Sequence, residues 1–136
     1  MIPVAIKGFN EIDALKVTIP QLIAIGVKEI VFFDGPFTEF KSEKDYSTDG
    51  TLEYLQNFDE ITIIPCGRMN LMDKENKVFE VMASFNNVMI LDCDEIINGD
   101  WIMFNQVYNL IKCNYPSILY GVAFTDMDMY YTTRTN

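Results

Sequence analysis

Residues 88 to 95 read VMILDCDE, an apolar run that passes directly into a cluster of acidic residues. A short, wholly apolar run of this kind predicts a β-strand buried on both faces, as strands of parallel sheets are. Asp92 and Asp94 then stand one residue apart at the strand's end, where they can serve a single metal site. Mg²⁺ or Mn²⁺ takes one or two protein carboxylates while substrate phosphates complete its shell. On spacing alone, loop acids that cap the following segment are an equal alternative.

Three more apolar runs precede this one, over residues 2–6, 29–33 and 60–65. Helical periodicity separates them, over 11–25, from the Ser-Thr-Asp-Gly segment at 47–50 to about Phe58, and over 73–85. Strands that alternate with helices in this way predict an α/β fold with a mostly parallel sheet covered on both faces.

The same patterns give local expectations. Pro20 inside the first helical segment predicts a kink or two short helices, and Ser47 or Thr48 is the expected N-cap of the second helix. Residues 37–46 are expected to form a loop. Beyond Gly99 we expect a helix over 100–113 and two further strands over 118–124 and 127–132. In the helix expected over 73–85, four side chains are expected to face the core: Val78, Phe79, Val81 and Met82.

Composition narrows the classes of function. The 136 residues predict one domain, and the net charge of −10 with scattered bases disfavours binding to nucleic acid or to an anionic membrane. The absence of histidine excludes Ser-His-Asp and Cys-His catalysis and leaves carboxylates to carry acid–base or metal chemistry. Three widely spaced cysteines disfavour a disulfide framework. No apolar run is long enough for a membrane span, so a cytoplasmic protein is expected.

Ligands of open parallel sheets lie beyond the carboxyl ends of the strands. In this chain those ends carry residues 8–11, 34–36, 66–68 and 92–95. Three of these four segments contain carboxylates, so the sequence predicts an acidic site at this edge of the sheet.

The order of these segments resembles that of family 2 glycosyltransferases and their GT-A relatives, over about residues 2 to 95. That family opens with an apolar strand and an aromatic-Asn-Glu step, which is Phe9-Asn10-Glu11 here. Its second strand ends in Asp-Gly and a Ser-Thr-Asp-Gly-Thr segment follows, matched here by residues 32–35 and 47–52. An apolar strand that leads into Asp-x-Asp-Glu is its third hallmark. The resemblance implies a GT-A fold, a Rossmann-like three-layer sandwich with a mostly parallel central sheet.

The resemblance also implies that Gly8, Phe9 and Glu11 line a nucleotide pocket and that Asp34 accepts a hydrogen bond from the base. A turn residue is the structural alternative for Asp34. A helix N-terminal acid, favoured by the helix dipole, is the alternative for Glu11.

For the acidic pair, the resemblance implies that Asp92 holds the ribose and that Asp94, together with Asp92, binds Mn²⁺ or Mg²⁺. The cation bridges the diphosphate of a UDP- or GDP-linked sugar and stabilises charge on the departing nucleotide. Lys77, on the helix before this strand, is expected to face the donor, with Arg68 as a second candidate. A solvated helix lysine is the alternative for Lys77.

The chain departs from the family in three ways. Lys7-Gly8 stands where the family commonly has Thr-Tyr after a proline, and about eleven residues are inserted between Gly35 and Ser47. The family's general base lies well beyond the Asp-x-Asp motif, whereas 42 residues follow Asp94 here.

Those 42 residues hold one acidic pair, Asp126 and Asp128, which we interpret as exposed strand residues. The catalytic base therefore stays unassigned, and the acceptor side of the domain is expected to be truncated. The acceptor itself stays open among glycans, proteins and lipids.

Two other functions fit parts of the sequence. In a haloacid-dehalogenase-type phosphatase, Asp92 would be the nucleophile and Asp94 the acid–base residue, with Mg²⁺ as cofactor. That family usually has Thr or Val where Ile96 stands. A catalytically silent GT-A domain that binds a nucleotide is the third alternative.

Overall fold

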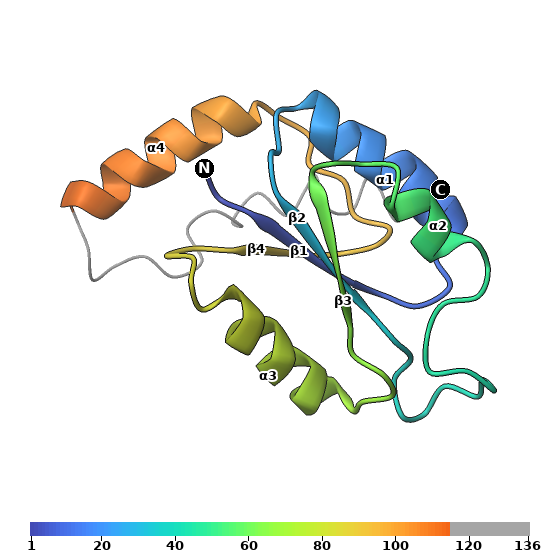
Figure 1. Cartoon of the computed structure of the whole chain (residues 1–136). Coiled ribbons are helices and arrows are strands. Elements are labelled where there is room, and N and C mark those ends of the chain that lie inside the picture. The colour runs from blue at the N-terminus through green and yellow to red at the C-terminus, as the bar shows by residue number, and fades with distance from the viewer. Residues whose placement is uncertain (115–136) are drawn as a thin grey trace.

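The computed structural model describes residues 1–114, which form four strands and four helices in alternation (Figure 1). The elements are β1 Val4–Gly8, α1 Ile12–Ala24, β2 Ile30–Asp34, α2 Thr51–Leu55, β3 Ile61–Pro65, α3 Leu71–Met82, β4 Met89–Asp92 and α4 Trp101–Asn114.

The four strands form one parallel sheet in the order β3-β2-β1-β4. Gly8 of β1 pairs with Asp34 of β2, and Lys7 pairs with Asp92 of β4. The carboxyl ends of these three strands therefore meet at one edge. The predicted α/β class with a parallel sheet is confirmed for the described residues.

Helices cover both faces of the sheet, because alternate strand residues point to opposite sides. On one face the even residues of β1 and β2, such as Ile6 and Phe32, pack with side chains of α1, α2 and α4. On the other face Ala5, Val31 and Phe33 pack against α3. Figure 1 shows the resulting layers, with α3 alone on its side of the sheet.

Several local expectations were wrong. α1 is one helix and not two short ones, with Pro20 on its exposed side, whereas the alternative of a kink at Pro20 stays a prediction. Phe79 is 57% exposed, because only the stripe that contains Val78 and Met82 faces the sheet. The N-cap of α2 is Gly50, not Ser47 or Thr48, and α2 ends at Leu55, before Phe58. The strands expected over 118–124 and 127–132 lie outside the described residues.

Residues 47–51 instead cap the N-terminus of α1, which has no side-chain cap of its own. The backbone N–H groups of residues 10, 11 and 12 donate to Ser47 Oγ (2.8 Å), Thr51 Oγ1 (3.1 Å) and Asp49 Oδ2 (3.2 Å), respectively. The N–H groups of residues 11 and 12 are among those that a helix end leaves without an intrahelical partner, and residue 10 directly precedes them. The Ser-Thr-Asp-Gly-Thr segment is thus a cap supplied from about forty residues away.

Replacing Asp49 with alanine is expected to destabilise the protein by about 1 kcal/mol at pH 7, as loss of an N-cap does. Burial raises the pKa of Asp49, but hydrogen bonds from Thr51 and Ile12 outweigh this and hold it below 3.8. A depressed folded-state pKa means that the contribution is complete above the unfolded-state pKa and is lost as pH falls through the folded-state value. Urea unfolding at pH 7 and pH 3 measures the change, with Asp59→Ala as the control on an exposed acid. An equal cost at both pH values would contradict the contribution of the charge.

Within residues 1–114, the helices include none with the length and apolar content that crossing a membrane requires.

Candidate functional site

The carboxyl ends of β1, β2 and β4 open onto a cavity of about 380 Å³. Ligand pockets typically have volumes of about 300–1,000 Å³. The cavity is lined by Lys7, Gly8, Phe9, Glu11, Gly35, Pro36, Phe37, Phe40, Lys74, Asp92, Cys93 and Asp94. Of the eight residues proposed from the sequence as site residues, five therefore lie together, namely Gly8, Phe9, Glu11, Asp92 and Asp94.

The segment after β4 alternates between exposed and buried residues. Asp92 and Asp94 are exposed, whereas Cys93 and Glu95 are buried. Glu95 Oε2 accepts a hydrogen bond from the backbone N–H of Asp92 at 2.9 Å, so Glu95 is the acid that closes this turn. The alternation leaves Asp92 and Asp94 in the cavity wall.

Glu11 brings a third carboxylate to the same cavity from the start of α1. Its pKa is raised above 4.5 by burial and by the negative charges of Asp94 and Asp49. Glu11 and Asp94 line the same cavity, so their like charges repel each other. A cation between them would relieve this repulsion.

The donor set fits a divalent cation that shares its shell with a ligand. Among residues 1–114, no group of three His, Cys, Asp or Glu side chains is arranged to hold a metal ion by itself. Mg²⁺ commonly uses only one or two carboxylates and completes its shell with phosphates and water. Asp92 and Asp94 supply that number of hard oxygen donors.

Two lysines line the cavity from the side of α3. Lys74 is 1% exposed, donates from Nζ to the carbonyl of Gly35 and lies 4.9 Å above the centre of the Phe37 ring. Burial lowers the pKa of Lys74, and an anion in the cavity would favour its charged form. Lys7 lies on β1 and pairs with Glu75 of α3.

Lys77, the lysine expected to face the donor, does not line the cavity; its nearest charged partner is Glu80 at 3.8 Å. Lys74 lies in the wall instead, one helical turn earlier. A signal for this was present, because Lys74 stands four and eight residues before Val78 and Met82 and so shares their buried stripe.

Asp34 is 1% exposed and does not line the cavity, although its neighbour Gly35 does. Its Oδ2 accepts from the backbone N–H of Ser47 at 3.0 Å, and its Oδ1 accepts from Ser47 Oγ at 2.5 Å. Ser47 Oγ in turn accepts from the N–H of Asn10. Asp34 thus fixes the segment that caps α1, and its expected contact with a base stays a prediction.

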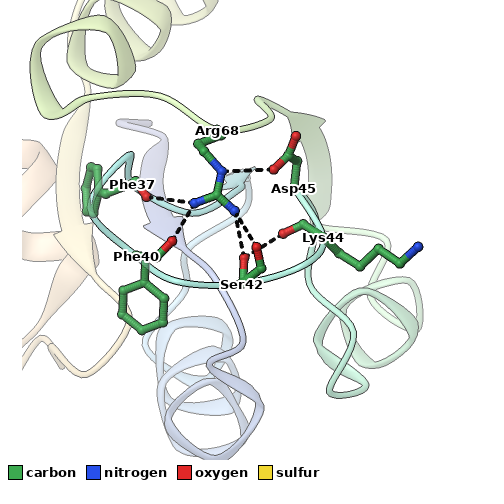
Figure 2. Close-up of polar contacts among 6 residues, drawn as sticks. All are labelled: Phe37, Phe40, Ser42, Lys44, Asp45 and Arg68. Atoms are coloured by element: carbon green, nitrogen blue, oxygen red, sulfur yellow. Dashed lines mark hydrogen bonds and ion pairs between the residues drawn. The ribbon is translucent and has the colours of Figure 1, made fainter.

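Arg68, the second candidate for a donor contact, also lies outside the cavity lining. Its guanidinium group is engaged with the backbone and side chains of residues 37–45 (Figure 2). That loop brings Phe37 and Phe40 into the cavity wall. Neither ring was expected at the site from the sequence, because no local motif marks residues 37–45 as part of a site. Asp126 and Asp128 lie outside the described residues.

Comparison of the chain with models of protein families and with curated protein sequences finds no match.

Proposed function

We propose that the cavity binds a nucleotide-sugar through a divalent cation and that the protein is a GT-A-type glycosyltransferase. The observation that carries the proposal is the meeting of three carboxylates and two lysines in one cavity at the carboxyl ends of parallel strands. A diphosphate needs cationic partners, and carboxylates beside it are favourable only when a metal ion lies between them.

The capped end of α1 supports this choice of ligand chemistry. In dinucleotide-binding sheets the pyrophosphate binds the N–H groups at the start of the first helix. Here Ser47, Thr51 and Asp49 already accept from the N–H groups of residues 10, 11 and 12. With these N–H groups engaged, a cation and the two lysines are the partners that we assign to a phosphate in this cavity.

Each group then has a role in the transfer. Asp92 and Asp94 bind the cation, which stabilises negative charge on the departing diphosphate. Lys74 and Lys7 lie in the wall on the side of α3, where they offset charge on the phosphates. The buried Cys93 thiol supports the floor, because its Sγ donates to the carbonyl of Lys7 at 3.2 Å and burial raises its pKa.

UDP or GDP together with Mn²⁺ is expected to raise the free energy of unfolding more than either ligand does alone. The rise with both present is about 2.7 kcal/mol at a hundredfold excess over the dissociation constant. In Asp94→Asn we expect the affinity for the nucleotide with Mn²⁺ to fall at least about tenfold, since even an outer partner of a metal ligand contributes that much. Calorimetry measures both. Asp59→Asn is the matched control, because it removes the same charge at an exposed position outside the cavity.

Equal nucleotide affinity in EDTA and in Mn²⁺ would contradict the bridging cation. Incubation with UDP-sugars and GDP-sugars then separates the possible activities. Release of the free nucleotide supports a transferase, and tight binding without release indicates a silent domain. A phosphoryl group covalently bound to Asp92, detected by mass spectrometry after incubation with a phosphate ester, would replace the proposal with a phosphatase.

A further inference from the structure

The aromatic ring of Phe40 lies in the cavity wall, yet it belongs to neither hydrophobic core. Phe40 is 59% exposed, and its ring contacts the ring of Phe9 edge to face, with the two ring centroids 5.8 Å apart. An exposed apolar ring in the wall of the cavity adds little to either hydrophobic core. It offers a flat surface to whatever the cavity binds.

Arg68 fixes the loop that carries this ring. Its Nη1 donates to the carbonyls of Phe37 and Phe40, and its Nη2 donates to the carbonyl and Oγ of Ser42, both at 2.9 Å. Its Nε donates to Asp45 at 3.1 Å. Figure 2 shows the guanidinium group at the centre of the loop, with these partners around it.

Backbone hydrogen bonds hold the start of the same loop to the segment that follows β3. The N–H of Thr38 donates to the carbonyl of Met69 at 3.0 Å, and the N–H of Met69 donates to the carbonyl of Pro36 at 3.2 Å. The Phe40 ring is therefore presented to the cavity without help from a ligand. Such preorganisation reduces the entropy that binding costs.

The cavity has an aromatic side and an acidic side. Phe37 and Phe40 come from the loop after β2, whereas Asp92 ends β4 and Asp94 follows it. β1 lies between these two strands. A nucleoside diphosphate has the same polarity, with a planar ring at one end and phosphates at the other.

We propose that Phe40 is a stacking platform for the base of the nucleotide and that Arg68 is the positioning residue that holds it in place. This inference rests on the proposed function, because it takes the ligand to be a nucleoside diphosphate. A base stacked on an aromatic side chain typically contributes about tenfold or more in affinity.

A tryptophan at position 40 reports the contact directly. The chain has one tryptophan, Trp101, which is 1% exposed, so Phe40→Trp adds a single exposed fluorophore. With Mn²⁺ present, UDP or GDP is expected to quench its emission saturably, and inorganic diphosphate is expected to bind without quenching. Phe79→Trp, on the exposed side of α3 and outside the cavity, is the control and is expected to show no saturable change.

Calorimetry on unlabelled variants tests both residues. Phe40→Ala is expected to weaken UDP binding about tenfold and to leave the affinity for inorganic diphosphate with Mn²⁺ unchanged. Arg68→Lys keeps the charge but cannot reach all its partners, and it is expected to give the same selective loss. The double variant should bind UDP no more weakly than Phe40→Ala, because Arg68 acts through the ring.

The outcomes separate this inference from the proposed function. If Phe40→Ala binds UDP as tightly as the unmodified protein does, or loses UDP and inorganic diphosphate equally, the stacking platform is wrong while the nucleotide site stands. Additive losses in the double variant would overturn the positioning role of Arg68. If the unmodified protein binds neither nucleotide nor inorganic diphosphate with Mn²⁺, the proposed function fails and this inference fails with it.

Discussion

Gly35→Ala is expected to destabilise the protein by about 3 to 5 kcal/mol. A Cβ at Gly35 would lie 2.1 Å from the carbonyl oxygen of Gly67 and 3.0 Å from its carbonyl carbon. Both are backbone atoms, so no side chain can move aside. Overpacking typically costs about 1–3 kcal/mol, and the φ of +148° at Gly35 adds strain for any residue with a Cβ.

The junction around Gly35 has little room to relax. Its N–H donates to the carbonyl of Gly8 at 3.2 Å, its carbonyl accepts from Lys74, and Cys66 N–H donates to the carbonyl of Asp34 at 2.8 Å. These contacts join the ends of β1, β2 and β3 around the cavity. Loss of this junction is expected to remove ligand binding together with stability.

Gly67→Ala is the matched control, because it changes the other glycine of the same contact. Gly67 has a φ of +70°, but a Cβ there meets nothing within 4 Å, so we expect a cost of only about 1 kcal/mol from backbone strain. Urea unfolding followed by the fluorescence of Trp101 and by circular dichroism measures both variants. If the two variants lose equal free energy of unfolding, the contact between a Cβ at position 35 and the carbonyl oxygen of Gly67 is not the cause of the loss.

Asp34→Ala is expected to destabilise the protein by about 3 kcal/mol, because it removes the buried acceptor of two hydrogen bonds from Ser47. Ser47→Ala removes one of them and is expected to cost about 2 kcal/mol. The double variant should cost less than the sum of the two, because both single changes remove the same hydrogen bond between Ser47 Oγ and Asp34 Oδ1. Additive costs would contradict the coupling between them.

The same variant tests the role that the sequence assigned to Asp34. If Asp34 acts only through Ser47, the affinities for UDP, GDP and ADP fall by one common factor in Asp34→Ala. If Asp34 also accepts from a base, the loss is greatest for bases that offer an imide or amide N–H. Calorimetric titration of the three nucleotides in the presence of Mn²⁺ distinguishes these results.

The sequence alone determined the class of the fold and one edge of the site. Apolar runs such as residues 88–91 are long enough for strands and too uniformly apolar to leave one face in water. Their alternation with helices required a parallel sheet, and parallel strands bring their carboxyl ends to one edge. For that reason Glu11, Asp92 and Asp94 could be expected together, and they line one cavity. The implied GT-A family stays a proposal.

Tertiary structure alone decided which polar groups this edge uses for folding and which it presents to a ligand. Residues 47–51 resembled a cap for the helix that follows them, yet they cap α1. Asp34 is buried against Ser47, and Arg68 holds a loop that begins about thirty residues earlier in the chain. Each of these partners is distant in sequence, so no local propensity encodes the choice. Buried groups such as those of Asp34 and Ser47 pair with whichever partner the packed elements bring within reach, because leaving one unpaired costs more than a local preference supplies.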